Sequence, residues 1–174
     1  TLAVVNNAGG LGAMRPLVRM DPGELAHTLA LNVGAPAWLM GWAHGLSAGR
    51  RVRVVNVSSG AAHSAYPGWG SYCASKAALD MLGRVLACEA DEVAAPAAED
   101  LAVLAFAPGV LATDMQTALR ATDEADFPRR ARFLELHEGG GLLDPALPAA
   151  RIVEWLDAES VAPYAEERFT PPSA

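Results

Sequence analysis

The sequence lacks several features that mark whole classes of protein. Its only cysteines, Cys73 and Cys88, fall on one predicted helix, roughly 22 Å apart at ~1.5 Å rise per residue and too far to form a disulfide. No run approaches the ~18 apolar residues of a membrane-spanning helix, and the chain does not start with a basic segment followed by an apolar one. These absences predict a cytoplasmic protein with reduced thiols and no contact with a membrane.

Positive charge is also scarce. The 174 residues include 13 lysines and arginines against 20 aspartates and glutamates, which gives a net charge of −7 and an isoelectric point near 5.0. A chain of this charge repels phosphate backbones, so nucleic acids are not expected among its partners. Apolar residues are plentiful, since 52% of the chain is hydrophobic and 19% is charged. This is enough for the core of one globular domain over residues 1–174.

Apolar runs that end in small polar residues alternate with helical patterns along the chain. Strands are expected at 2–5, 52–59, 101–109 and 162–170. Helices are expected at 24–46 with a bend at 34–36, at 70–92, at 113–122 and at 145–157, with loops at 94–100 and 137–145. This alternation is typical of a parallel sheet covered by helices on both sides, which binds ligands at the carboxyl ends of its strands.

One predicted helix places a phenol and an ammonium group together. Tyr72 and Lys76 are four residues apart, so their side chains share one helix face. A tyrosine with a pKa of ~10 is a poor acid near neutral pH, and a nearby ammonium lowers that pKa by favouring the phenolate. Ser59, at the end of the preceding strand, could hold a substrate carbonyl while the phenol protonates it. This combination predicts carbonyl reduction, although a solvated tyrosine and lysine would show the same spacing.

Five motifs, taken in order, resemble those of the short-chain dehydrogenase/reductase family. They are NNAG at 6–9, LNV at 31–33, NVSSG at 56–60, YCASK at 72–76 and PGVLATDM at 108–115. The resemblance covers nearly the whole chain and implies a Rossmann-like, doubly wound parallel sheet that binds a dinucleotide. Within the family, GWGSYCASKAALDML, APGVLATDMQ and FLELHEGGGLLD are most similar to the sepiapterin reductases, which reduce the side-chain ketone of a pterin with NADPH.

The resemblance implies a role for each matched residue. Tyr72 would be the general acid and base, Lys76 would lower its pKa and bind the nicotinamide ribose, and Ser59 would orient the carbonyl. Asn32 would hold a water of a proton relay; without the resemblance it would be interpreted as a helix residue that faces solvent. The substrate would also contact Gly60 and Gly109. The cofactor would contact Tyr72 and Lys76 together with Asn7, Ala8, Gly9, Leu111, Ala112, Thr113, Asp114, Met115 and Gln116. Thr113 and Asp114 would serve equally as a helix N-cap.

The glycine-rich phosphate-binding turn with which members of this family begin is absent. The segment GGLGAMR at 9–15 lacks the third glycine of the G-x-G-x-x-G pattern and follows the wrong strand, and GGGLLD at 139–144 opens no suitable helix. The chain begins where the family's fourth strand would be, so we expect a partial domain that lacks the first three strands and exposes the edge of strand 2–5. The segment that separates NADP from NAD would lie in that part. Sepiapterin reductases bind the pterin through an acidic residue in the last strand. At the corresponding position this sequence has Arg168, directly after Glu166 and Glu167.

The leading hypothesis is an NADP-dependent carbonyl reductase of a small molecule, of the pterin-reducing type that serves tetrahydrobiopterin biosynthesis. One alternative is a truncated, non-catalytic fragment that binds no cofactor. Another is a family reductase for a different ketone. The resemblance also implies a homodimer formed through the helices at 24–46 and 70–92, and no metal ligand is predicted.

Overall fold

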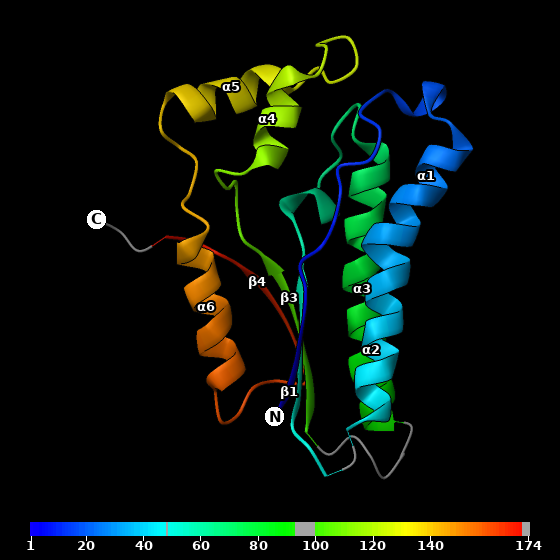
Figure 1. Ribbon diagram of the computed structural model, residues 1–174, viewed down its shortest axis with the longest axis vertical. Coiled ribbons are helices and arrows are strands. Elements are labelled where there is room, and N and C mark those ends of the chain that lie inside the picture. Colours follow the sequence, from blue (N-terminus) through cyan, green and yellow to red (C-terminus); the bar gives the residue numbers. More distant parts are fainter. Residues whose placement is uncertain (48, 93–99, 172–174) are drawn as a thin grey trace.

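A parallel sheet between two layers of helices forms the protein (Figure 1). The computed structural model describes residues 1–47, 49–92 and 100–171. The four strands lie side by side in chain order: β1 (Leu2–Asn6), β2 (Val52–Val57), β3 (Leu101–Ala107) and β4 (Tyr164–Arg168). All three pairings are parallel, so the predicted Rossmann-like α/β fold is confirmed. Within the described residues β1 is an edge strand, as expected.

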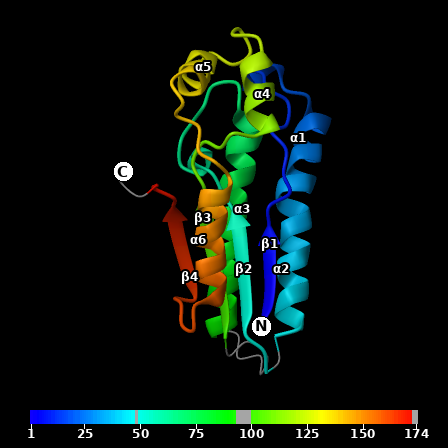
Figure 2. The ribbon, with the colours of Figure 1, turned by 60° about the vertical axis from the view of Figure 1, so that its left-hand side comes forward.

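Helices cover both faces of this sheet (Figures 1 and 2). One face carries α1 (Pro22–Leu29), the π-helical turn η2 (Ala30–Gly34), α2 (Ala35–Gly45) and α3 (Gly70–Glu92). The other face carries α6 (Ala146–Asp157), while α4 (Asp114–Ala121) and α5 (Arg130–Glu138) lie beyond the carboxyl ends of the strands. Short 3-10 turns occur at η1 (Leu17–Arg19) and η3 (Gly60–Ala62). None of these described helices is long and apolar enough to cross a membrane.

The predicted helix at 24–46 is continuous but changes register in the middle. Asp21 caps its start, since the carboxylate accepts hydrogen bonds from the backbone N–H groups of the next turn. Pro36 has no N–H to donate to the carbonyl four residues before it. The chain accommodates this with a π turn, in which the N–H of Ala35 donates to the carbonyl of Ala30. The turn directs Asn32 into the interior, where it is 1% exposed.

The apolar runs of the central strands are buried on both faces. On one face Val52, Val54 and Val103 pack with Met40 and Leu79 of the helices. On the other face the apolar partners are Val55, Leu104 and Phe106 from the sheet with Trp155 from α6. This two-sided burial explains why apolar residues occupy both odd and even positions of these strands instead of alternating strictly with polar ones.

A third apolar cluster lies above the sheet and was not expected. It joins Trp69 and Tyr72 to Leu119 of α4, to Phe127 of the segment between α4 and α5, and to Phe133 of α5. The helix α5 was not predicted either, because its sequence has no clear apolar stripe and it is held mainly by this cluster. The expected loop at 94–100 lies largely outside the described residues.

Candidate active site

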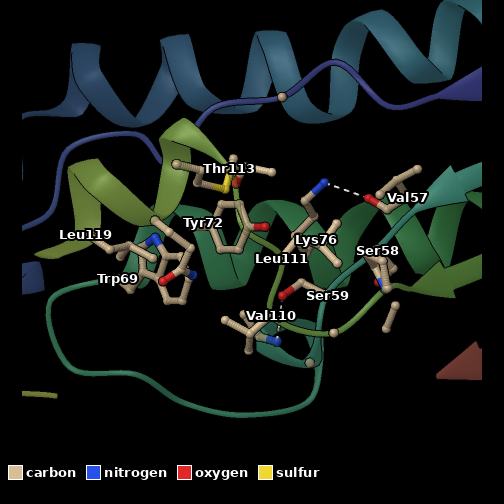
Figure 3. A pocket seen from close by; sticks show the side chains of 18 of the residues that line it. Val57, Ser58, Ser59, Trp69, Tyr72, Lys76, Val110, Leu111, Thr113 and Leu119 are labelled. Carbon is tan, nitrogen blue, oxygen red and sulfur yellow. Dashed lines mark hydrogen bonds between the residues drawn. The ribbon is translucent and has the colours of Figure 1, made fainter. Parts of the chain in front are cut away.

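A cavity of about 220 Å³ opens at the carboxyl ends of β1, β2 and β3. Eleven predicted site residues line it: Asn7, Gly9, Ser59, Gly60, Tyr72, Lys76, Gly109, Leu111, Thr113, Met115 and Gln116. Four others do not line it: Ala8, Asn32, Ala112 and Asp114. Residues separated by more than 100 positions in the sequence thus converge at the place where parallel sheets bind ligands (Figure 3).

The tyrosine and lysine of α3 face this cavity together with the serine at the end of β2 (Figure 3). The Lys76 ammonium lies 5.6 Å from the centre of the Tyr72 ring and donates a hydrogen bond of 2.7 Å to the Val57 carbonyl. The Ser59 hydroxyl lines the same cavity as the phenol and accepts a hydrogen bond from the Ala61 N–H. This bond fixes Ser59 at the start of the η3 turn.

The electrostatics of the pair differ from the prediction. Burial raises the pKa of Tyr72 above its usual 10, and the Ser59 hydroxyl only partly opposes this. Lys76 does not lower the pKa of Tyr72 as expected, because the lysine loses its proton at a lower pH than the phenol and is neutral when the phenol titrates. Burial likewise lowers the pKa of Lys76 to about 8, although Asp80 acts in the opposite direction.

Asn32 supports the site from behind the cavity. Its side-chain NH₂ donates to the Gly10 carbonyl at 2.8 Å and to Ser75 Oγ at 3.0 Å, and its Oδ1 accepts from the Gly10 N–H at 2.9 Å. Ser75 in turn donates to the Tyr72 carbonyl. The amide therefore ties the loop after β1 to the helix that carries the tyrosine, and the solvent-facing alternative does not hold.

The segment after β3 is held over the cavity by the chain that follows α5. Gly109 makes the turn at φ 87°, a value that favours glycine. Leu143 then pairs with the segment, because its N–H donates to the Val110 carbonyl and its carbonyl accepts from the Ala112 N–H, both at 2.9 Å. Thr113 occupies the N-cap position of α4 but makes no capping side-chain bond, so its hydroxyl is available to a ligand.

Comparison with known proteins agrees with this geometry. The family profile described as short chain dehydrogenase matches residues 2–124. The chain belongs to the short-chain dehydrogenase family. It is 35% identical over 161 residues to benzil reductase ((S)-benzoin forming) of Bacillus cereus. The aligned region covers 91% of this chain and 63% of that protein. It is 37% identical over 164 residues to sepiapterin reductase of Meriones unguiculatus. Here the aligned region covers 91% of this chain and 59% of that protein.

Solved structures show the same fold. The crystal structure of the KRED1-Pglu enzyme superposes with a TM-score of 0.82 at 27% identity, over 94% of this chain and 68% of that one. This short-chain dehydrogenase chain spans about three fifths of the length of the curated relatives it matches.

The lining of the cavity fits the nicotinamide nucleotide that this family uses. Gly9 lets a planar group approach the lysine closely, since a Cβ there would lie 3.3 Å from Asn32 Oδ1 and 3.7 Å from Lys76 Nζ. The buried amide of Gln116 leaves its Oε1 without a partner among the described residues, which suits a ligand hydrogen-bond donor. An ammonium, a phenol and a free hydroxyl provide further partners for the hydroxyls of a ribose.

Sequence reasoning missed one wall of the cavity, which consists of Tyr66, Trp69, Val110, Leu119, Arg132 and Phe133. Arg168, which stands where the resemblance implies an acidic residue, ends β4 and also lines the cavity. The aromatic residues of YPGW at 66–69, directly before α3, were a usable signal. Nothing in the local pattern of α5 points to a cavity, because its residues reach the site only through tertiary packing.

Proposed function

We propose that this chain carries the catalytic part of a carbonyl reductase that uses a nicotinamide nucleotide. The observation that supports this most strongly is the convergence of Tyr72, Ser59 and Lys76 on one cavity at the carboxyl ends of the strands. The phenol and the lysine are nearly buried, so their interactions with a ligand are little screened by water.

The raised pKa of Tyr72 suits an acid in the direction of reduction. At neutral pH the phenol keeps its proton and can donate it to the oxygen of a ketone. The Ser59 hydroxyl donates a second hydrogen bond to the same oxygen and so stabilises the negative charge that develops there. The Lys76 ammonium then stabilises the phenolate that remains. When bound, the nucleotide supplies the hydride that reaches the ketone carbon.

For the cofactor we propose NADP, on the resemblance to the sepiapterin reductases. Tyr72 and Lys76 would hold the nicotinamide ribose, and Asn7, Ala8 and Gly9 would lie along one side of it. The segment Leu111–Gln116 would cover the other side, with Thr113 and Gln116 as its polar contacts. Ala8, Ala112 and Asp114 do not line the cavity, so they would act through their backbone or on a part of the nucleotide outside it.

The cavity wall favours a ketone attached to a planar aromatic group. Trp69 stacks on the Tyr72 ring with centroids 4.4 Å apart, and Phe133 packs edge-on to Trp69. A flat aromatic ring beside the phenol would make further contacts of this kind. Sepiapterin, a pterin ketone, meets this description and is our first candidate substrate.

An aromatic diketone such as benzil is the second candidate. Arg168 lines the cavity at the place where the resemblance leads us to expect an acidic residue that grips a pterin. An arginine there would repel neither a diaryl diketone nor its product, and the chain is also 35% identical to a benzil reductase.

We also propose a homodimer. The outer faces of α2 and α3 expose Trp38, Trp42, Met81 and Val85, a set of large apolar side chains on the two helices from which a dimer was expected. A second copy covering these side chains would remove them from water.

The test uses the protein at its full natural length. Oxidation of NADPH and of NADH is followed with sepiapterin, with benzil and with an aliphatic ketone of similar size, and nucleotide binding is measured separately by NADPH fluorescence. We expect reduction of an aromatic ketone with preference for NADPH. Nucleotide binding without reduction of any ketone would refute the reductase. The non-catalytic alternative concerns the 174-residue chain itself and predicts that this chain alone changes no NADPH fluorescence.

A further inference from the structure

A buried carboxylate follows the catalytic lysine by one helical turn. Asp80 is 5% exposed on α3, and its Oδ2 accepts a hydrogen bond of 2.7 Å from Ser58 Oγ. Its Oδ1 has no hydrogen-bond partner in the described residues. A carboxylate buried with so few partners destabilises a fold unless nearby charge offsets the lost hydration. The charge on the same helix face is the ammonium of Lys76.

Lys76 and Asp80, both on α3, form hydrogen bonds with two consecutive residues at the end of β2. Lys76 donates to the Val57 carbonyl at 2.7 Å, and Asp80 accepts from Ser58 at 2.7 Å. The next residue of the chain is Ser59, which lines the cavity together with the phenol of Tyr72. The contact with Asp80 therefore fixes the backbone that presents the catalytic serine.

Burial raises the pKa of Asp80, and two cationic side chains oppose this, His63 more strongly than Lys76. His63 Nε2 lies 3.7 Å from Asp80 Oδ2 on a largely exposed ring, so Lys76 is the buried cation of the two. Glu166 of β4 adds a second negative charge nearby and is itself paired with Arg84. Ser64, Glu167 and Arg168 line the same side of the site. The Tyr164 hydroxyl donates to Glu166 at 2.8 Å and lies 3.3 Å from the Asp80 backbone carbonyl.

A second cavity of about 280 Å³ adjoins this carboxylate. Asp80, His63 and Glu166 line it, and it shares Ser58 and Arg168 with the lining of the first cavity. Asp80 thus borders a cavity other than the one that Tyr72 and Lys76 line.

We propose that Asp80 is a positioning residue of the active site, which anchors the end of β2 through Ser58 and places a negative charge one turn from the Lys76 ammonium. The proposal rests on the proposed function for its catalytic meaning. Without Asp80, burial would act on Lys76 unopposed, and the lysine would lose its proton at lower pH. A neutral lysine cannot stabilise the phenolate that reduction leaves on Tyr72.

The chain offers a direct readout because Lys76 is its only lysine. Protein labelled with ¹³C at the lysine ε-carbon gives one lysine signal, which is followed by NMR from pH 5 to 11. We expect a midpoint near 8 in the wild type and a midpoint about one unit lower in Asp80→Asn. Asp157→Asn, which removes an exposed carboxylate from α6 on the other face of the sheet, should leave the midpoint unchanged.

An unchanged midpoint in folded Asp80→Asn would overturn the proposal. If this variant does not fold, the wild type decides instead: its lysine signal must show a second inflection that coincides with the titration of the Asp80 carboxyl carbon. Absence of that inflection would equally refute the coupling.

Kinetics give a second readout in the protein at its full natural length. Activity that needs the ammonium falls as the pH rises through the pKa of Lys76, so the alkaline limb of kcat/KM should move down by about one unit in Asp80→Asn. A uniform loss at every pH would contradict the proposal. If no ketone is reduced, the proposed function fails, while the NMR titration still tests the role of Asp80.

Discussion

Replacing Lys76 by methionine should stabilise the fold while removing a group that the proposed reaction needs. Lys76 is nearly buried, and burial lowers its pKa from 10.5 to about 8. The protonated side chain therefore opposes folding at neutral pH, because the unfolded chain keeps the ammonium in water. Methionine has a similar unbranched shape, fills irregular space in cores and carries no charge.

The size of the effect follows from the two pKa values. The difference between 10.5 and about 8 corresponds to roughly 3 kcal/mol of folding free energy at pH 7. Methionine also loses the hydrogen bond to the Val57 carbonyl, worth about 1 kcal/mol. We therefore expect Lys76→Met to gain roughly 2 kcal/mol at pH 7.

The pH dependence has a definite sign. The penalty is fully present below about pH 8 and disappears as the pH rises from about 8 to 10.5, because the native state releases its proton before the unfolded state does. At pH 10 the remaining penalty is about 1 kcal/mol, so the advantage of methionine should vanish.

Urea denaturation at pH 7 and pH 10, followed by circular dichroism, measures this difference. Arg50→Met, which removes an exposed positive charge, is the matched control and should change stability little at either pH. A Lys76→Met variant that is less stable than the wild type at pH 7, or equally stabilised at both pH values, would refute the reasoning.

Other substitutions test the scaffold of the site. Asn32→Ala should destabilise the protein by about 2 kcal/mol in urea denaturation, because the buried amide makes three hydrogen bonds that leave partners unsatisfied; an effect below about 0.5 kcal/mol would show that water replaces them. Gly68→Ala should weaken the near-UV dichroism of the aromatic cluster, since φ is 83° and a Cβ would lie 1.9 Å from the Asp126 carbonyl oxygen; an unchanged spectrum would contradict this. Trp38→Glu should give monomers in sedimentation, because Trp38 is 69% exposed on the proposed dimer face, whereas Trp38→Phe should keep the dimer.

Regular periodicity made the elements that carry the site predictable. The helix α3 has the predicted bounds because apolar residues recur along it at three- and four-residue intervals. Helical spacing alone then placed Tyr72 and Lys76 on one face, and the structure shows both in the cavity. The predicted strand at 52–59 ends earlier, at Val57. The Ser58 N–H still donates to the Phe106 carbonyl, while the side chains of Ser58 and Ser59 bond α3 and η3.

Features that depend on tertiary contacts were not predictable. The raised pKa of Tyr72 results from burial beneath Trp69 and the aromatic cluster, and the inward turn of Asn32 results from a π turn that the helical pattern does not reveal. Arg132 and Phe133 enter the cavity from a helix with no distinct apolar face. In each case the deciding contacts join residues that are far apart in the sequence.

The central claim is that the Tyr72 phenol protonates a ketone held beside it by Ser59. The most direct measurement compares the rate of ketone reduction by the wild type and by Tyr72→Phe, in protein at its full natural length, with NADPH binding measured for both. Phenylalanine keeps the ring that stacks on Trp69 and removes only the hydroxyl. We predict a loss of at least about a hundredfold in rate with nucleotide binding nearly unchanged. Comparable turnover by the two proteins would contradict the assignment.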